Sequence, residues 1–279
     1  MRLRDDFVAV KVPATSANLG PGFDSMGLAL DLGDEVSVHA TTGATSVVVE
    51  GEGAGNVEQG EDNLVVRALR LALDRVGAPQ VGVRMHCTNR IPHSRGLGSS
   101  ASAIVAGVTL ARALIGDAEV LGRQEILEIG SQMEGHPDNV APAVFGGATV
   151  AWMNEETSEV GSVRLTPPEG ISPVAFIPDF ELRTAAARAA LPATVPHGDA
   201  SFNVARGALL AAVLSGNAQV SGGVDLHSLL MEATRDRLHQ EQRRAAMEPS
   251  LALVDWLRGA GFAAVVSGAG PTVLSLESV

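Results

Sequence analysis

The chain has 279 residues, of which 46% are hydrophobic and 19% are charged, so it is long and apolar enough for two modest hydrophobic cores. Its formal net charge is −12, aromatic residues make up 3%, and tyrosine is absent. A nucleic-acid-binding protein is therefore not expected, because the surface repels phosphate backbones and few side chains could stack on bases.

A single cysteine, Cys87, excludes an internal disulfide and a cysteine-rich zinc site, and its strand-like neighbours predict a buried, inert thiol. No apolar run approaches the roughly 20 residues that span a bilayer, and the N-terminus lacks the pattern of a signal peptide. We therefore expect a cytoplasmic protein that does not bind a membrane.

The apolar pattern predicts strands where it alternates and helices where its period is near 3.6. In chain order we expect strands at 7–12, 28–40 and 45–50, a helix at 63–77, a strand at 81–87, helices at 99–116 and 126–135, strands at 148–153, 162–168 and from 173, helices at 183–191, 200–214 and 249–261, and two strands within 262–276. Residues 13–27 have turn chemistry. This order predicts an α+β fold with a domain boundary near 155–170.

The stretch IPHSRGLGSSASA, at 91–103, lies between a predicted strand and a strongly apolar helix. Such a loop suits phosphate, because the free amides and the dipole of a helix N-terminus favour an anion. Gly96 and Gly98 would let the backbone approach a ligand closely, while Ser99 and Ser100 could cap the helix, bind phosphate oxygen or present a hydroxyl to Mg²⁺. The lysine of a P-loop and the third glycine of a dinucleotide loop are both missing. The loop is thus either another kind of phosphate site or a plain serine-capped helix.

Other polar residues also allow two interpretations on spacing alone. Asn18 and Asp24 are turn formers, or they recognise a small zwitterion. Glu134 is a solvated residue at a helix end, or a metal ligand. Asp138 and Asn139 cap a helix, or they contact a substrate.

Several motifs resemble those of the GHMP kinases, a superfamily that includes galactokinase, homoserine kinase and mevalonate kinase. PHSRGLGSSASA resembles the superfamily's signature loop, and VVSGAGPTVLSL, at 265–276, resembles its C-terminal glycine motif. PATSANLGPGFDSMGLAL, at 13–30, resembles the N-terminal motif of the homoserine kinases, and MEGHPDNVAPAVFGG and TAAARAALP are also similar to that family. The matches spread over almost the whole chain in the family's order.

The resemblance implies a two-domain α+β fold with an active site between the domains. Residues 1–160 would be similar to the second domain of ribosomal protein S5, and residues 161–279 would be ferredoxin-like. Members usually continue beyond the last glycine motif with a helix and a strand, so we expect a second domain that is short at its C-terminal end.

The implied activity is phosphorylation of L-homoserine by ATP to O-phospho-L-homoserine, a step in threonine biosynthesis, with Mg²⁺. The family also implies a homodimer. The alternatives are a mevalonate or shikimate type of kinase from the same superfamily, or a non-catalytic nucleotide or amino-acid sensor on the same fold.

The same resemblance assigns the nucleotide and the metal. The implied ATP-binding residues are Asn63, Pro92, His93, Ser94, Arg95, Gly96, Leu97, Gly98, Ser99, Ser100, Ala101 and Ser102, with Asn63 near adenine. Mg²⁺ would be held by Glu134 with Ser99 or Ser100, because this ion prefers hard oxygen ligands together with phosphate. Many members have extra residues between the glycine that follows this glutamate and the next histidine, whereas here Gly135 joins His136 directly.

For the acceptor, Asp24 would bind an ammonium group, Asn18 a hydroxyl, and two arginines a carboxylate. The implied substrate-binding residues are Asn18, Asp24, His136, Asp138, Asn139, Arg188 and Arg243, and the implied catalytic residues are Asn139, Thr184 and Arg188. Asn139 stands where mevalonate kinase and galactokinase have an aspartate, and it cannot take a proton. Catalysis would then rest on positioning and charge neutralisation, with the proton passing to a phosphate oxygen.

Two further features have ordinary structural explanations. Gly268 and Gly270 either form a simple hairpin or allow a close approach to the 91–103 loop. The remaining histidines show no metal-ligand spacing and are expected to be solvated or structural; they include His86, His93, His197, His227 and His239.

Overall fold

The computed structural model describes residues 2–117, 119–217, 219 and 221–278. Its larger sheet has the strand order β3-β4-β2-β5-β6, with β1 paired to β2. The pairing is antiparallel except between β3 and β4. The strands are β1 (Phe7–Ala17), β2 (Met26–Thr41), β3 (Ser46–Gly51), β4 (Gly82–Asn89), β5 (Ala148–Met153) and β6 (Val160–Leu165).

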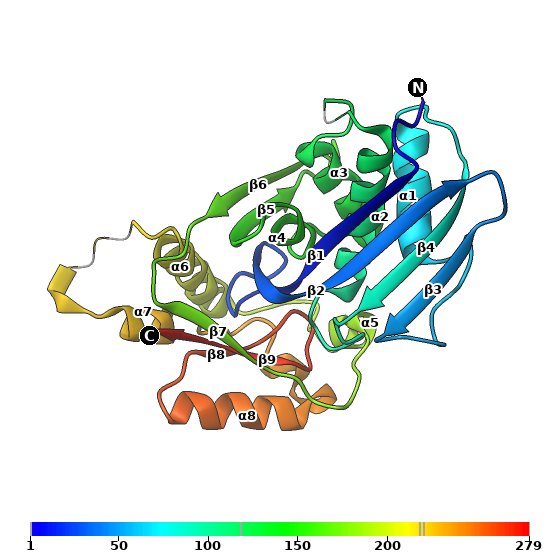
Figure 1. Cartoon of the computed structure of the whole chain (residues 1–279). Helices are drawn as coiled ribbons and strands as arrows, with labels where there is room; N and C mark the ends of the chain where they lie inside the picture. The colour runs from blue at the N-terminus through cyan, green and yellow to red at the C-terminus, as the bar shows by residue number, and fades with distance from the viewer. Residues whose placement is uncertain (1, 118, 218, 220, 279) are drawn as a thin grey trace.

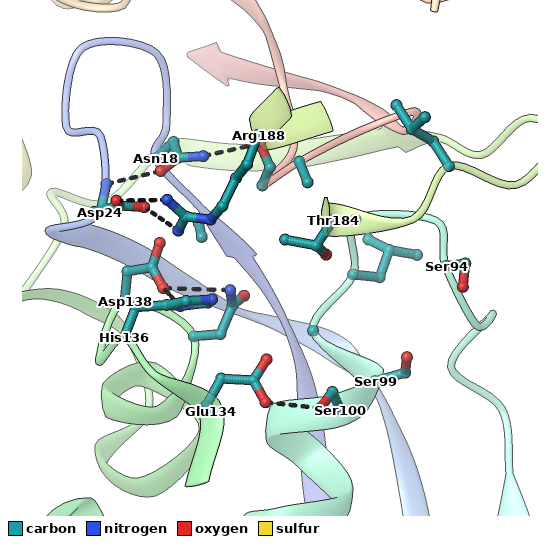
Figure 2. A pocket seen from close by; sticks show the side chains of 18 of the residues that line it. Asn18, Asp24, Ser94, Ser99, Ser100, Glu134, His136, Asp138, Thr184 and Arg188 are labelled. Carbon is teal, nitrogen blue, oxygen red and sulfur yellow. Dashed lines mark hydrogen bonds and ion pairs between the residues drawn. The ribbon is translucent and has the colours of Figure 1, made fainter. Parts of the chain in front are cut away.

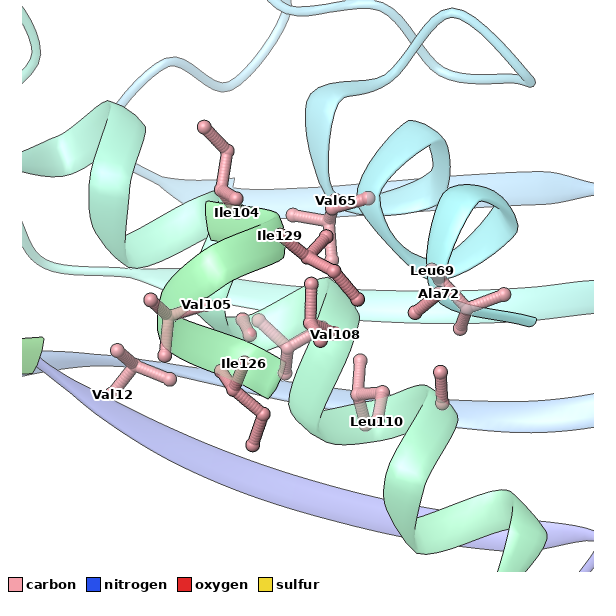
Figure 3. Packing of buried hydrophobic residues seen from close by; sticks show 14 of the residues in the cluster. Val12, Val65, Leu69, Ala72, Ile104, Val105, Val108, Leu110, Ile126 and Ile129 are labelled. Carbon is pink, nitrogen blue, oxygen red and sulfur yellow. The ribbon is translucent and has the colours of Figure 1, made fainter. Parts of the chain in front are cut away.

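Four helices cover one face of this sheet (Figure 1). They are α1 (Leu64–Arg75), α2 (Ser99–Ile115), α3 (Arg123–Glu134) and α4 (Val140–Phe145). Apolar side chains from β1, α1, α2 and α3 pack together between the helices and the sheet (Figure 3). They include Val12, Val65, Ile104 and Ile126. The small residues of α2 permit close packing, because a Cβ at Gly107 would overlap the backbone of α1.

The single cysteine lies in this core. Cys87 is 2% exposed, and burial, with the nearby Asp34 carboxylate, raises the pKa of its thiol to about 11. The expectation of a buried thiol is confirmed, and the raised pKa disfavours the reactive thiolate.

The second sheet has three antiparallel strands in the order β7-β9-β8 and helices on both faces. Alternation along β8 separates two cores: Val265 packs with α6 and α7, whereas Ala264 and Val266 pack with α8. The elements are β7 (Ile171–Phe176), α5 (Thr184–Ala189), α6 (His197–Leu214), a 3₁₀ turn (Ser221–Gly223), α7 (Leu226–Ala233), a 3₁₀ helix (Glu241–Ala246), α8 (Glu248–Gly259), β8 (Ala264–Val266) and β9 (Val273–Ser278).

The two sheets share a core, because Leu19 and Met26 from the first unit pack in the same cluster as Leu210 and Leu274 from the second. The first sheet continues through β6, and the second begins with β7, so residues 166–170 connect the two. A division at residue 160 falls at the start of β6, and the exact domain boundary stays a proposal.

Two local features differ from the sequence pattern. Strand β1 continues to Ala17 through residues that were predicted as turn, because a register irregularity between Pro13 and Thr15 lets the strand pass the proline. Helix α7 was not predicted from the sequence. Within the described part of the chain, no helix is long and apolar enough to cross a membrane.

Candidate active site

Two neighbouring cavities meet at the N-terminus of α2. The inner cavity, of about 150 Å³, lies between the two units and is lined mainly by polar and charged side chains. The outer cavity, of about 400 Å³, lies between α1, α2 and the strands β2 to β4 and has a more apolar lining. Ser94, Ser99 and Ser100 line both cavities, so one ligand could extend from the outer into the inner cavity.

The start of α2 leaves its first amide groups available. Gly98 is the N-cap in a left-handed conformation, with φ of 68°, and no side chain caps the helix. In the described residues, the first amide of this helix with a backbone partner is that of Ser102, which donates to the Gly98 carbonyl at 2.9 Å. The alternative of a serine-capped helix therefore does not apply, and the geometry is that of an anion site.

The 91–103 loop is held in place by the segment between β8 and β9. Ser267 donates its hydroxyl to the Gly96 carbonyl at 2.7 Å, and the Thr272 amide donates to the Arg95 carbonyl at 3.1 Å. A side chain at Gly96 would overlap the Ser267 carbonyl, and one at Gly98 would overlap the Thr15 hydroxyl. The expected close approach between the two glycine motifs is thus present, and it depends on the absence of a side chain at Gly96.

Glu134, the last residue of α3, points to the N-terminus of α2 (Figure 2). The Ser100 hydroxyl donates a 2.7 Å hydrogen bond to its carboxylate. Carboxylate and hydroxyl oxygens are suitable donors for Mg²⁺. No cluster of three or more histidine, cysteine or acidic residues that could hold a metal occurs in the portion that the structure describes, so a cation here would need oxygens from a bound phosphate.

In the inner cavity, Asp24 of the loop between β1 and β2 forms an ion pair with Arg188 of α5. Arg188 donates from Nη1 to Asp24 Oδ2 at 2.9 Å and from Nη2 to Asp24 Oδ1 at 2.6 Å. Asn18 fixes the loop that carries the carboxylate, since its Oδ1 accepts from the Asp24 amide at 2.9 Å and its Nδ2 donates to the Gly268 carbonyl at 2.8 Å. Thr184, at the start of α5, lines the same cavity.

A second arginine lies deeper. Arg243 is 1% exposed and lines the inner cavity, and its Nε donates to the Ala187 carbonyl at 3.2 Å. Burial and the nearby Arg188 lower the pKa of Arg243 below its usual value. The centroid of the Phe23 ring lies 5.7 Å from Arg188 Cζ and 5.4 Å from Arg243 Cζ, so the ring offers a cation–π contact to both guanidinium groups.

The loop before α4 contributes three polar residues. His136 Nδ1 lies 2.6 Å from Asp138 Oδ1. Burial lowers the pKa of His136, but the hydrogen bond and charge of Asp138 outweigh this and raise the pKa above 6.5. Asn139 accepts at Oδ1 a 2.8 Å hydrogen bond from the Thr15 hydroxyl, which orients its amide. Thr15 was missed in the sequence, although it lies in the motif that begins at Pro13.

Only some of the remaining residues that the resemblance assigns to ATP line a cavity. Asn63, His93 and Ser102 line the outer cavity. Asn63 is also the N-cap of α1, where it accepts from the Val65 amide at 3.0 Å. Pro92, Arg95 and Ala101 do not line either of the two cavities.

The Arg95 side chain is turned toward the segment after β7. Its Nε donates to the Pro178 carbonyl at 2.9 Å, and its Nη2 donates to the Asp179 carbonyl at 2.5 Å. This side chain therefore links the two units.

Comparison with known proteins gives consistent results. The family model for the GHMP kinases N terminal domain matches residues 63–147, and the model for the GHMP kinases C terminal region matches residues 218–276. The homoserine kinase of Leifsonia xyli subsp. xyli is 49% identical over 273 residues, which cover 97% of this chain and 81% of that protein. The homoserine kinase of Streptomyces coelicolor is 47% identical over 270 residues, which cover 96% and 84%.

The crystal structure of homoserine kinase from Cytophaga hutchinsonii superposes with a TM-score of 0.85 at 26% identity, covering 99% of this chain and 86% of that one. These matches confirm the two-domain α+β fold that the motifs implied. The chain belongs to the homoserine kinases of the GHMP kinase superfamily.

Proposed function

We propose that this protein transfers the terminal phosphoryl group of ATP to the side-chain hydroxyl of L-homoserine, giving ADP and O-phospho-L-homoserine. The observation that carries the proposal is the uncapped N-terminus of α2 at the junction of the two cavities. A phosphate chain that enters from the outer cavity would meet these amides with its terminal group directed into the inner cavity.

The outer cavity suits an adenine nucleoside. Its lining combines apolar side chains with amides that can recognise a base or a ribose. The apolar residues include Val36, Val49, Val57 and Leu64, and the amides include Asn56, Asn63 and Asn89. The net charge of −12 does not oppose this binding, because the local field is set by the amides at the helix tip.

Glu134 and Ser100 are the residues that would hold Mg²⁺ at the phosphates, and Ser99 is adjacent. When bound, the ion would neutralise phosphate charge, which is a main requirement of phosphoryl transfer. The contribution of the chain is to hold the carboxylate at the helix tip, which the 2.7 Å hydrogen bond from Ser100 to Glu134 does.

The inner cavity suits a zwitterion. Asp24 offers a negative charge to an ammonium group, and Arg188 and Arg243 offer guanidinium groups to a carboxylate. Mevalonate and shikimate lack an ammonium group, so either compound would leave Asp24 without a partner from the substrate. An amino alcohol is therefore the favoured acceptor.

The acceptor hydroxyl would lie near Asn139 and Thr184. Asn139 Oδ1 accepts from Thr15, and one amide proton of Asn139 is directed to Asp138 Oδ1 at 3.4 Å. The second amide proton is the donor that we assign to a ligand in the inner cavity. We infer that the chain supplies alignment and donors at this position, with the proton passing to a phosphate oxygen.

The direct test is an assay of the purified protein with ATP and Mg²⁺ against homoserine, mevalonate and shikimate. We expect ADP release that depends on homoserine, with O-phospho-L-homoserine identified by ³¹P NMR. Turnover with mevalonate or shikimate alone would support another GHMP kinase. ATP binding without ADP release in the presence of homoserine would support the non-catalytic sensor.

Two further aspects are part of the proposal: a homodimer, which the family resemblance suggests, and a cytoplasmic location. Light scattering coupled to size-exclusion chromatography tests the first, with a mass near twice 28.7 kDa expected for the dimer.

A further inference from the structure

His239 is buried without contact to solvent and is hydrogen-bonded at both ring nitrogens. Nε2 lies 2.6 Å from the Gly20 carbonyl oxygen, and Nδ1 lies 3.0 Å from Arg243 Nη1. A carbonyl oxygen only accepts hydrogen bonds, and a guanidinium group only donates them. The two partners together therefore specify a neutral imidazole with its proton on Nε2.

The two partners lie on different segments: Arg243 lines the inner cavity, and Gly20 lies in a loop whose residues Asn18 and Asp24 line it. Gly20 lies in the loop between Asn18 and Asp24, and this loop packs closely, because a Cβ at Gly20 would overlap the Thr234 carbonyl. Arg243 lies in the 3₁₀ helix Glu241–Ala246 of the second unit. The ring of His239 also contacts Phe23, at a centroid distance of 5.0 Å, and Phe23 contacts both guanidinium groups.

The backbone of His239 is itself fixed. The carboxylate of Asp236 accepts hydrogen bonds from the amides of Leu238, His239 and Gln240, at 2.8 to 3.0 Å. Asn203 of α6 donates to the same carboxylate at 2.7 Å. A turn held by this many hydrogen bonds presents the imidazole in one orientation.

The Arg243 guanidinium depends on this imidazole for its orientation. Its acceptors are the Ala187 carbonyl at 3.2 Å, His239 Nδ1 at 3.0 Å and the Gly268 carbonyl at 3.4 Å, so the ring nitrogen is the nearest. Within the described residues, Arg243 Nη2 makes no hydrogen bond to the protein, which leaves it for an anion in the inner cavity.

We propose that His239 is a positioning residue for amino-acid binding: its Nδ1 orients the Arg243 guanidinium toward the substrate carboxylate, while its Nε2–H fixes the loop that carries Asp24. This inference rests on the proposed function, because it concerns the affinity for homoserine. Nothing in it involves the outer cavity, so ATP binding is expected to be independent of His239.

Three substitutions separate the two hydrogen bonds. His239→Leu removes both, His239→Asn places an amide oxygen near the position of Nδ1, and His239→Gln places an amide nitrogen near the position of Nε2. We expect His239→Leu to raise the KM for homoserine roughly 10- to 100-fold, because a hydrogen bond to a charged group is lost. The KM for ATP should stay within about 2-fold. His239→Asn should restore most of the homoserine affinity, and His239→Gln should restore less.

Ser250→Ala is the matched control for loss of a buried polar contact. Ser250 is 4% exposed and donates to the Pro271 carbonyl at 2.6 Å, and it does not line either cavity of the site. The melting temperature of Ser250→Ala should fall, while its KM values for homoserine and ATP should not change. An unchanged KM for homoserine in His239→Leu would overturn the proposal, and so would a parallel rise in both KM values. If His239→Leu does not fold, the comparison of His239→Asn with His239→Gln tests the proposal. Equal KM values for homoserine in these two variants would overturn the proposal.

A spectroscopic measurement keeps the inference separate from the proposed function. In ¹⁵N-histidine-labelled wild-type protein, the resonances lost in His239→Asn identify this ring. The expected pattern is a protonated Nε2 and an unprotonated Nδ1 at neutral pH. A wild-type protein that does not phosphorylate homoserine would refute the proposed function alone, whereas an Nδ1–H tautomer or a charged ring would overturn the role of His239 whatever the substrate.

Discussion

Asp24 and Arg188 form a two-point ion pair across the inner cavity, with nitrogen–oxygen distances of 2.9 and 2.6 Å. The Asp24 carboxylate stands in for the carboxylate of an amino acid at Arg188. The Arg188 guanidinium likewise stands in for its ammonium group at Asp24. A zwitterion could replace this pair with two new ones, one to its ammonium group and one to its carboxylate. Because the side chains are 36% and 38% exposed, water screens the pair, and opening it costs little.

Arg188→Ala should therefore impair homoserine use far more than folding. We expect kcat/KM for homoserine to fall roughly 100-fold, because a charged hydrogen-bond donor to the substrate is lost. The free energy of unfolding in urea should change by less than about 1 kcal/mol, since the pair is exposed. Arg183→Ala, at the exposed residue just before α5, is the control and should retain activity. A large loss of stability with unchanged kcat/KM would contradict this assignment.

Glu134→Gln should raise the Mg²⁺ requirement. The substitution keeps the size of the side chain and its ability to accept from Ser100, but it removes the negative charge that favours the cation. We expect the half-saturating Mg²⁺ concentration to rise roughly 10-fold or more at fixed ATP. Glu128→Gln, six residues earlier on α3, is the matched control. Equal Mg²⁺ dependence in the wild type and Glu134→Gln would exclude Glu134 as a ligand.

Gly96→Ala should destabilise the junction between the two units. Its Cβ would lie 2.8 Å from the Gly270 carbonyl oxygen and would overlap the Ser267 carbonyl, and both are backbone atoms that cannot rotate away. We expect a loss of about 3 kcal/mol in urea unfolding. Gly77→Ala has a similar positive φ but no atom within 4 Å, so it should lose only about 1 kcal/mol from backbone strain. Equal losses for the two variants would show that close contact at Gly96 is not what matters.

The pH dependence of stability should contain a component from His239. Burial lowers the pKa of His239 from its usual 6.5; Arg243 adds to this, while Asp236, the Gly20 carbonyl and Asp24 oppose it. The unfolded chain therefore takes up this proton more readily than the folded protein. The stability is complete above about pH 6.5 and decreases as the pH falls toward the folded pKa, by at most about 1.4 kcal/mol per pH unit.

Urea unfolding of the wild type and His239→Asn, at several values between about pH 5 and pH 8, measures this component. The two curves of stability against pH should diverge below about pH 6.5, with the steeper decrease in the wild type. Parallel curves would mean that His239 does not titrate with the predicted sign.

Much of the fold could be predicted because its elements have strong local signals. The helix expected at 63–77 is α1 at Leu64–Arg75, and the small-residue helix expected at 99–116 is α2 at Ser99–Ile115. Strand β1 was predicted too short, because Pro13 suggests a turn, whereas tertiary pairing with β2 extends the strand beyond it. Helix α7 has only eight residues, too few for its period to stand out.

The site could be predicted in part, because motifs list residues but do not show how they pair. The structure brings Asn18, Glu134, Asn139 and Thr184 to one cavity, as the motifs suggested. The bond between Asp24 and Arg188 joins positions 164 residues apart, and no local pattern indicates it. His239 was expected to be solvated or structural, since a lone histidine has no distinguishing spacing, and its two partners emerge only from the packing of three segments.

The central claim is that the free amides at the start of α2 bind the phosphates of a nucleotide whose base lies in the outer cavity. A crystal structure with a non-hydrolysable ATP analogue, Mg²⁺ and homoserine tests it most directly. We predict density for the phosphates against the amides of Ser99 and Ser100, with the homoserine hydroxyl facing the terminal phosphate from the inner cavity. A nucleotide bound elsewhere, with the tip of α2 empty, would contradict the account.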